Sequence, residues 1–266
     1  MFSQLTNDPA GFLINLLYTI PGVLLALTLH EVSHGYTAYR CGDDTAMKLG
    51  RLSLNPLRHL DPIGAVCLLL FRVGWARPVP VNPRNYRHYR RDDLLVSSAG
   101  ILMNLCLYIL ATVLCVLCVR LMIPAAQQGQ KVFFNDHRYG IIDHDLIWYA
   151  VITDRYNTYL YEMIGQGVLS NTFLRYLYHF LYRFAGLNLS LALFNLLPVP
   201  PLDGFHIFND IIFRGRLRIS PQVFRFGMAA LLIVSFATNW ISTALTFMID
   251  LVDGGLMSVL LPLFGL

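Results

Sequence analysis

His30, Glu31 and His34 form a His-Glu-x-x-His sequence near the start of the 266-residue chain. On a helix, residues i and i+4 share one face, so both imidazoles can bind the same tetrahedral zinc ion. Glu31 directly follows the first histidine and can reach a water molecule at the metal as its general base. The alternative is a chance match on a buried helix of a soluble protein, because a lone motif of this kind also occurs without a metal.

The setting of the motif favours the zinc site. It closes the apolar run from Gly11 to Leu29, so the three polar side chains lie at the end of a predicted membrane-spanning helix. Ionisable side chains are costly in a bilayer and by default face a hydrated protein interior, where they have a function. The sequence therefore predicts hydrolytic chemistry at membrane depth.

Two histidines leave a catalytic zinc ion one protein ligand short. The best candidate is Asp203, in the sequence Asn195-Leu-Leu-Pro-Val-Pro-Pro-Leu-Asp203-Gly204. Three prolines break an apolar helix there, and irregular backbone at membrane depth is tolerated only where protein or a wet cavity surrounds it. Two alternatives stay open: Asp203 caps the helix that resumes at Gly204, or His206 is the ligand in its place.

In these two motifs the chain resembles the site-2 protease family of intramembrane zinc metalloproteases, peptidase family M50. The first matches the family's HExxH and the second its NxxPxPxLDG signature. Three segments between them, 50–56, 59–64 and 74–83, resemble the compact bacterial branch without PDZ or CBS domains. The family's Ala-Gly-Pro-x-x-Asn pattern appears as Gly100-Ile101-x-x-Asn104 after an alanine, with isoleucine in place of proline.

The resemblance implies that His30, His34 and Asp203 bind Zn²⁺ and that Glu31 activates the water. It also implies that the substrate is a single-span membrane protein, cut in or near its transmembrane segment. A second interpretation is a non-proteolytic membrane protein that holds zinc or a substrate, although such a protein has no need of Glu31. A third, a zinc transporter, would need acids and histidines spread across its spans.

Composition and hydropathy predict an all-α membrane protein with one domain over residues 1–266. Apolar residues make up 56% of the chain and charged residues only 14%, against about 25% in soluble proteins. Stretches long enough to span lie at 11–39, 94–123, 187–213 and 223–251. Residues 63–73 are too few to span, so they predict a re-entrant or β-hairpin element between the first two helices.

The positions of charged residues predict how the chain is oriented in a bacterial cell membrane. Residues 40–93 hold ten Lys and Arg against five Asp, and 214–225 hold four Arg, so both loops should be cytoplasmic. Both termini and the charge-balanced segment 124–184, with an interfacial aromatic helix, should be outside. The basic residues lie beside apolar spans, so they indicate contact with lipid rather than with nucleic acid. The sequence predicts no particular oligomeric state.

Two groups of residues are candidates for binding the substrate. Val73–Val81 combines β-branched residues with prolines, which predicts a hairpin or edge strand able to pair with an unwound substrate, with Val79 and Val81 as its candidate substrate-binding residues. The alternative is a structural loop at the membrane surface. Asn104 and Asn195 can donate to the substrate backbone or to the developing oxyanion, and hydrogen bonding between helices is the equal alternative.

Overall fold

The computed structural model describes residues 9–61, 64, 76–122, 131–133, 139–141, 172–217, 220, 222–223, 227 and 240–263. The chain divides into two compact units. The first consists of Met1–Tyr108 with Gly186–Leu245, and the second of Ile109–Ala185 with Thr246–Leu266. Every residue of the candidate site belongs to the first unit.

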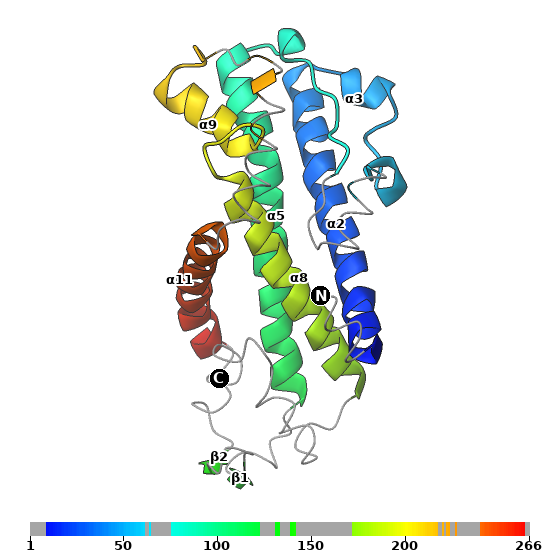
Figure 1. Cartoon of the computed structure of the whole chain (residues 1–266), viewed down its shortest axis with the longest axis vertical. Helices are drawn as coiled ribbons and strands as arrows, with labels where there is room; N and C mark the ends of the chain where they lie inside the picture. Colours follow the sequence, from blue (N-terminus) through cyan, green and yellow to red (C-terminus); the bar gives the residue numbers. More distant parts are fainter. Residues whose placement is uncertain are drawn as a thin grey trace. The chain divides into compact units, whose positions relative to one another are not determined.

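Among the described residues, three helices, labelled in Figure 1, are long and apolar enough to cross a bilayer. These are α2 (Pro9–Cys41), α5 (Tyr89–Met122) and α11 (Trp240–Leu263). Their candidate spans, Leu16–Cys41, Tyr89–Cys118 and Thr243–Leu260, each reach the length of about 18 residues or more that a bilayer requires. The prediction of a mostly helical membrane protein is therefore confirmed.

The predicted third span, 187–213, is two helices with a break between them. Helix α8 runs over Thr172–Asn195, and α9 over Asp203–Ile212. The prolines between them lack an N–H group and cannot continue a helical ladder, so the apolar sequence does not form one rod. The first part of α8 falls in the segment predicted as an external loop, because its aromatic residues were interpreted as a surface stretch.

The predicted fourth span, 223–251, differs from the described helix in its limits. Helix α11 begins at Trp240 and continues to Leu263, so its apolar stretch extends beyond residue 251. Most of 224–239 lies outside the described residues. Of residues 124–184, predicted to be external, the structure describes the start of α8 and two short antiparallel strands, β1 (Lys131–Phe133) and β2 (Tyr139–Ile141), with Lys131 opposite Ile141.

The described parts of the link between α2 and α5 are short helices and turns, held together at one buried carboxylate. Helix α2 ends at Cys41, followed by Gly42 with a φ of 111°, a backbone conformation that favours glycine. Asp43, fully buried, then accepts hydrogen bonds from the backbone N–H of Thr45 and Asn82 and from the side chain of Asn85. These bonds hold the start of the link, with α3 (Thr45–Lys48), to its end.

Two parts of the link, near residues 60 and 76, are joined by an isolated antiparallel bridge. Leu60 pairs with Ala76, and the N–H of Arg77 donates to the carbonyl of His59 at 2.8 Å. The turns η1 (Pro56–Arg58) and η2 (Pro83–Asn85) flank this bridge. The predicted re-entrant or hairpin piece, 63–73, lies outside the described residues except for Gly64 and stays a prediction.

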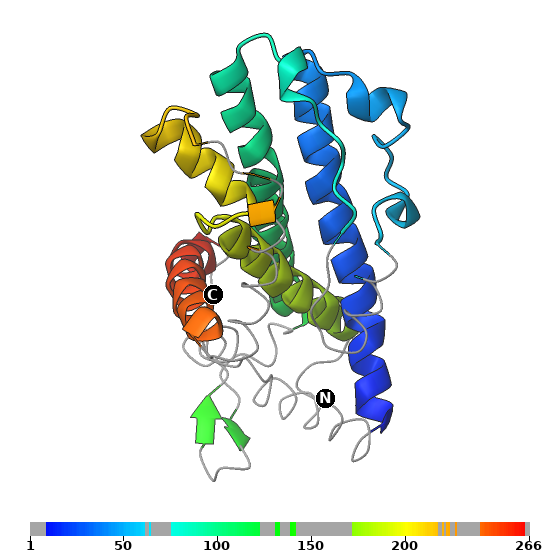
Figure 2. The same cartoon turned by 45° about the horizontal axis from the view of Figure 1, so that its top comes forward.

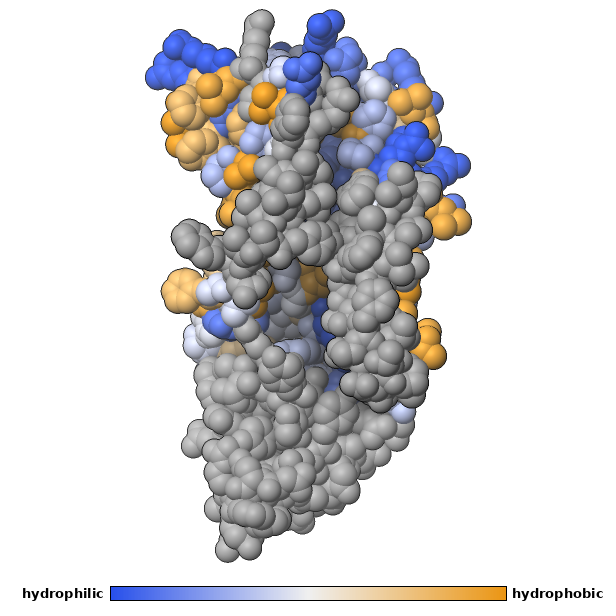
Figure 3. Space-filling view, viewed as in Figure 1, coloured by the Kyte–Doolittle hydropathy of each residue, from blue (hydrophilic) through white to orange (hydrophobic). Residues whose placement is uncertain are grey.

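Within the first unit, α2 lies beside the first half of α5, and α9 lies against the start of α5, as both views show (Figures 1 and 2). Hydrophilic side chains lie at the end of the unit formed by α3, the start of α5 and the end of α9, interspersed with hydrophobic ones (Figure 3). In the second unit, Cys115 of α5 packs on α8, with its thiol 4.0 Å from the carbonyl of Tyr178.

Candidate metal centre

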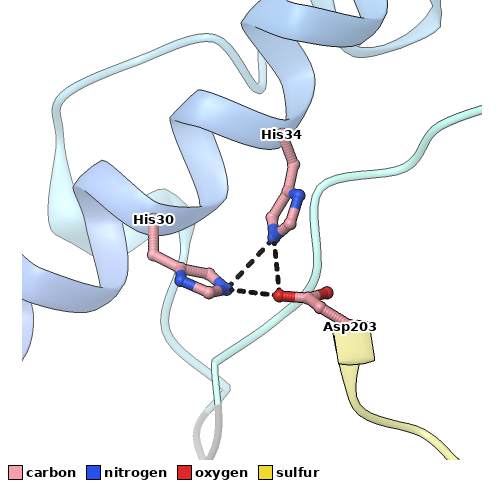
Figure 4. Close-up of side chains that lie close together, drawn as sticks. All are labelled: His30, His34 and Asp203. Carbon is pink, nitrogen blue, oxygen red and sulfur yellow. Dashed lines mark hydrogen bonds and ion pairs between the residues drawn. The ribbon is translucent and has the colours of Figure 1, made fainter. Parts of the chain in front are cut away.

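Three side chains from α2 and α9 meet at one point (Figure 4). His30 and His34 lie one turn apart on α2, and their Nε2 atoms are 3.1 Å apart. Oδ2 of Asp203, the first residue of α9, lies 3.2 Å from each Nε2 atom. Among the described residues, these form the one group of His, Cys, Asp or Glu side chains close enough to hold a metal ion. The residues predicted as ligands are thus brought together.

Asp203 does not cap α9, contrary to the alternative from the sequence. Helix α9 begins at Asp203 itself, and its N-cap is Leu202, whose side chain makes no capping bond. The carboxylate instead faces the two imidazoles, and its side chain is only 22% exposed. Gly204 allows this position, because any Cβ there would collide with the backbone carbonyl of Leu196 at the end of α8.

The other ring nitrogens of both histidines are held by α5. Nδ1 of His34 lies 2.7 Å from the carbonyl oxygen of Val96, so it carries the proton and leaves Nε2 with a free lone pair. Nδ1 of His30 lies 3.2 Å from the side-chain amide of buried Asn104. Histidines that bind metals typically donate their second N–H to a carbonyl or carboxylate in this manner.

The contact of Asn104 supports the same protonation of His30. The two ends of a carboxamide have nearly the same shape, so a half-turn of the amide places its oxygen against Nδ1. That oxygen is otherwise buried without a hydrogen-bond partner. Asn104 then accepts from Nδ1–H of His30, and Nε2 of His30 is also left with its lone pair toward Asp203. Asn104 therefore contacts a candidate ligand, which favours the interhelical alternative over a direct contact with substrate.

Helix α5 can approach this closely because residue 100 is glycine. A Cβ atom at Gly100 would lie 2.7 Å from Nε2 of His30 and closer still to Nε2 of His34. Both distances are far shorter than van der Waals contact, and the colliding atoms are ring atoms fixed on α2. Any larger residue at this position would therefore displace the imidazoles.

The donor set fits a zinc ion. Two lone-pair nitrogens that face each other at 3.1 Å repel unless a cation or proton lies between them, and Oδ2 of Asp203 is buried without a hydrogen-bond partner. Ligand atoms about 2.0–2.1 Å from a tetrahedral zinc ion lie about 3.3 Å apart. The observed separations of 3.1, 3.2 and 3.2 Å are close to that value. Two imidazoles and one carboxylate also leave a fourth position for water.

Glu31 lies next to this group without belonging to it. Its Oε2 atom accepts a hydrogen bond of 2.7 Å from the backbone N–H of Val79, in the link between α2 and α5. One carboxylate oxygen is therefore held by the backbone, which restricts the orientations of the Glu31 side chain. The sequence offered no signal for this contact, because a backbone N–H has no residue type.

The segment 77–82 lies beside the site, but the described residues form no regular strand there. The side chain of Val79 is buried and packs so tightly on Gly35 that a Cβ there would lie 2.8 Å from Cγ1 of Val79. Val81 packs against a core cluster of Ala38, Cys41, Tyr86 and Val96. Both side chains thus support the protein itself, whereas pairing of this backbone with a substrate stays a prediction.

Two further candidates lie apart from the three clustered side chains. Asn195 ends α8, and its side chain donates to the carbonyl of Leu191 in the same helix at 3.0 Å. His206 faces Asp93 of α5, with 3.7 Å between Nδ1 and Oδ2, and is not a member of the metal-binding group. Asp203, rather than His206, is therefore the third candidate ligand.

Comparisons with known proteins agree with this geometry. The model of peptidase family M50 matches residues 18–237. Three relatives bear the name "Putative zinc metalloprotease": YwhC of Bacillus subtilis (strain 168), Rip2 of Mycolicibacterium smegmatis and Rip2 of Mycobacterium tuberculosis. YwhC is 35% identical over 217 residues, which cover 82% of this chain and 79% of YwhC.

The two Rip2 proteins match a shorter part of the chain. They are 33% and 32% identical over 109 residues, which cover 40% of this chain and 42% of each relative. No solved structure matches the chain significantly.

Proposed function

Because the chain belongs to peptidase family M50, we propose that it is a zinc metalloprotease of the site-2 type, which hydrolyses a peptide bond in or near a transmembrane segment. The observation that carries this proposal is that His30 and His34, beside Glu31 on an apolar helix long enough to span, meet Asp203 of α9. A soluble hydrolase has no need to place such a group within a span, where ionisable residues are costly.

We assign His30, His34 and Asp203 as the zinc ligands and Glu31 as the general base. A zinc ion held there would acidify a water molecule and polarise the scissile carbonyl. Glu31 would take up a proton through the oxygen that Val79 does not engage and would deliver it to the leaving amine. The Val96 carbonyl and Asn104 keep the imidazoles oriented throughout.

For its topology, we propose a multi-pass protein of the bacterial cell membrane with the basic loops 40–93 and 214–225 in the cytoplasm and both termini outside. This is supported by the hydrophilic side chains at the end of the unit that contains α3 and the start of α5 (Figure 3). The motif end of α2 then lies toward the cytoplasm. We also propose four membrane spans in total, of which α11 provides one.

We propose a single-span membrane protein as the substrate, which must unwind locally because helical carbonyls are already hydrogen-bonded. Residues 77–82 are the candidate to receive the unwound strand, since Val79 lies directly at Glu31. On one edge of this segment, prolines 78 and 80 have no N–H. On the other edge, the N–H groups of Arg77 and Val79 already donate to His59 and Glu31. The next residue along that second edge is Val81, whose N–H is the candidate donor to the substrate.

Val81→Pro tests the strand separately from Glu31. It removes one backbone donor and leaves the N–H of Val79 in place. If the segment pairs with substrate, the variant should raise KM for a single-span substrate at unchanged zinc content. Val81→Ala serves as the control for the lost side chain. Equal KM in Val81→Pro and Val81→Ala would reject strand pairing here.

Glu31→Gln tests the enzymatic function. Wild type and variant would be expressed in membranes with a single-span substrate, and zinc content and cleavage measured on the same samples. We expect equal zinc and no cleavage in Glu31→Gln. Glu162→Gln is the control, because Glu162 is the other glutamate of the chain, and it should cut like wild type.

The outcomes separate the alternatives. Cleavage by Glu31→Gln at the wild-type rate would reject the general base. A wild-type protein without zinc would reject the metal site. Stoichiometric zinc without cleavage of any single-span substrate by the wild type would instead favour the non-proteolytic holding protein.

A further inference from the structure

Arg51, in the turn after α3, reaches across to the segment that contacts Glu31. One of its terminal nitrogens donates to the carbonyl of Arg77 at 2.8 Å and to that of Pro78 at 3.2 Å. These are the two residues before Val79, whose N–H donates to Glu31. A single guanidinium thus holds the backbone directly before the donor that orients the candidate base.

This segment has few other ties near Val79. The N–H of Arg77 bonds to His59 on one side, and the N–H of Asn82 bonds to Asp43 on the other. Between them, Pro78 and Pro80 have no N–H and cannot add a backbone donor. The hydrogen bonds from Arg51 to the carbonyls of Arg77 and Pro78 are therefore the main described polar contacts that position the N–H of Val79 relative to Glu31.

Arg51 is itself well placed for this task. Its own backbone N–H donates to the carbonyl of Ala46 at 2.9 Å, so its main chain is tied to α3. Hydrogen bonds from a charged donor are roughly twice as strong as neutral ones. A guanidinium also keeps its charge at all relevant pH values, so the contact does not depend on pH.

We propose that Arg51 is a positioning residue for Glu31, acting through the backbone of Arg77–Val79. The proposal rests on the function proposed above, in which Glu31 is the general base. Arg51 does not touch the reacting atoms in this arrangement. It fixes the N–H of Val79, which in turn fixes the rotamer of the Glu31 carboxylate against the metal centre.

The first test observes the contact without any need for cleavage. In protein labelled with ¹⁵N-valine, the amide of Val79 is identified as the resonance that Val79→Ala removes. An N–H bonded to a carboxylate resonates downfield. This shift should shrink in Glu31→Gln, whose amide oxygen is a weaker acceptor, and should be lost in Arg51→Gln. Arg51→Lys, which retains a charged donor, should restore most of it.

Arg58→Gln is the matched control. Arg58 is a neighbouring arginine whose side chain donates to the carbonyl of Gly50, and it has no described bond to residues 77–79. The Val79 resonance should keep its position in this variant. A Val79 amide unmoved in Arg51→Gln, or moved equally in Arg58→Gln, would overturn the proposal whether or not the protein is a protease.

The second test measures the effect on the reaction. Misplacement of a catalytic group by about 1 Å can cost about 100-fold in rate, so we expect Arg51→Gln to lower kcat 10- to 100-fold at unchanged zinc content. Arg51→Lys should recover most of this loss, and Arg58→Gln should cut like wild type. Loss of zinc together with activity in Arg51→Gln would point to a general structural role and reject the proposal.

A double-mutant cycle decides whether Arg51 acts through Val79. Val79→Pro removes the N–H that Glu31 accepts, so Arg51→Gln should lower kcat little further in that background. Additive losses would show that Arg51 acts by another route and would overturn the proposal. Cleavage by Glu31→Gln at the wild-type rate would instead refute Glu31 as the general base, and the amide test alone would then decide whether Arg51 holds the contact.

Discussion

The two parts of the metal centre are built in different ways. His30 and His34 lie on one uninterrupted helix, α2, where the i, i+4 spacing alone places both rings on one face. Asp203 comes from the break between α8 and α9, where seven residues separate the two helices. Its position depends on the packing of both helix ends and on no local spacing.

The contacts of each part follow this difference. The imidazoles need α5 only to choose their protonated nitrogen and to leave room at Gly100. The carboxylate needs the close approach of Gly204 to Leu196 and the anchoring of α9, where Arg90 of α5 donates to the carbonyl of Asp210 at 2.9 Å. The histidine pair should therefore tolerate changes around the break, whereas Asp203 should not.

Gly100→Ala should have the largest effect, because it disrupts the histidine pair itself, which changes around the break should leave intact. The new methyl group would overlap ring atoms of both His30 and His34, and neither α2 nor α5 can give way cheaply in a packed interior. We expect almost complete loss of bound zinc and of cleavage, measured by elemental analysis and by substrate processing.

The control for Gly100→Ala is Ser98→Ala on the same helix. Ser98 only donates to the carbonyl of Leu94 within α5, so this variant should keep its zinc. Wild-type zinc content in Gly100→Ala would show that the helices are farther apart than the structure has them.

Gly204→Ala should have the next largest effect and act on Asp203 alone. The added Cβ would meet the backbone of Leu196, which has no rotamer to change, so α9 must shift and carry the carboxylate with it. We expect zinc affinity to fall by at least about 100-fold. Loss of a residue that only supports a metal ligand costs up to about 100-fold, and here a ligand itself is displaced. Competition with a chelator measures this affinity.

Gly186→Ala is the matched control for Gly204→Ala. Gly186 lies within α8, where a Cβ would meet nothing within 4 Å. Zinc affinity should not change in this variant, and the helix should gain about 0.5–1 kcal/mol in stability from the better helix former. Equal zinc affinities in the two variants would show that the break does not determine the position of Asp203.

Much of the site could be predicted from the sequence because its metal ligands are side chains of recognisable types at recognisable spacings. Histidines at i, i+4 on an apolar run, and a lone aspartate after three prolines, are unusual enough to stand out. The prolines also predicted the broken backbone before Asp203, and the structure has it there. The predicted span 187–213 had the wrong limits, because one hydropathy window covered both α8 and α9 on the two sides of the break.

The remaining contacts are made by groups with no residue signature. The carbonyl of Val96 and the N–H of Val79 belong to the backbone, so only the fold can bring them to His34 and Glu31. Arg51 was one charge of a basic loop and one residue of the segment 50–56 in the family resemblance, and no role was predicted for it. For Asn104, contact with the substrate and hydrogen bonding between helices stayed equal alternatives, since its spacing on α5 does not reveal that it faces His30 across 74 positions in sequence.

Asn104→Ala should weaken the histidine part moderately. It removes the amide beside Nδ1 of His30, so the imidazole loses its preferred protonation and orientation. Loss of such an outer partner typically costs 10- to 100-fold in metal affinity, and we expect a value in that range by chelator competition.

Asn195→Ala is the matched control for Asn104→Ala, because the Asn195 amide bonds only within α8 among its described contacts. It should change zinc affinity less than Asn104→Ala does. An unaltered zinc affinity in Asn104→Ala would assign this residue to the substrate instead, and KM should then rise.

Asp43→Asn should have the smallest effect on the metal centre, because it acts on the link between α2 and α5 rather than on either part. Burial by itself would raise the pKa of Asp43, but the hydrogen bonds from Thr45, Asn82 and Asn85 outweigh it and lower the pKa. In the variant, an amide N–H₂ replaces one accepting oxygen and faces a donor. That mismatch should cost about 1–3 kcal/mol, or about 2–4 °C in Tm per kcal/mol.

Zinc content should stay at the wild-type level in Asp43→Asn, and cleavage should fall only a few-fold, through the segment that contacts Glu31. A carboxylate with a lowered folded-state pKa stabilises the fold above its ordinary pKa of about 3.9, and this contribution is lost as pH falls through the folded value. The Tm difference between wild type and variant should therefore be constant from pH 6 to 8 and shrink below about pH 4. Thermal unfolding in detergent across this range measures it, and a difference that grew on acidification would mean that Asp43 is protonated in the folded protein.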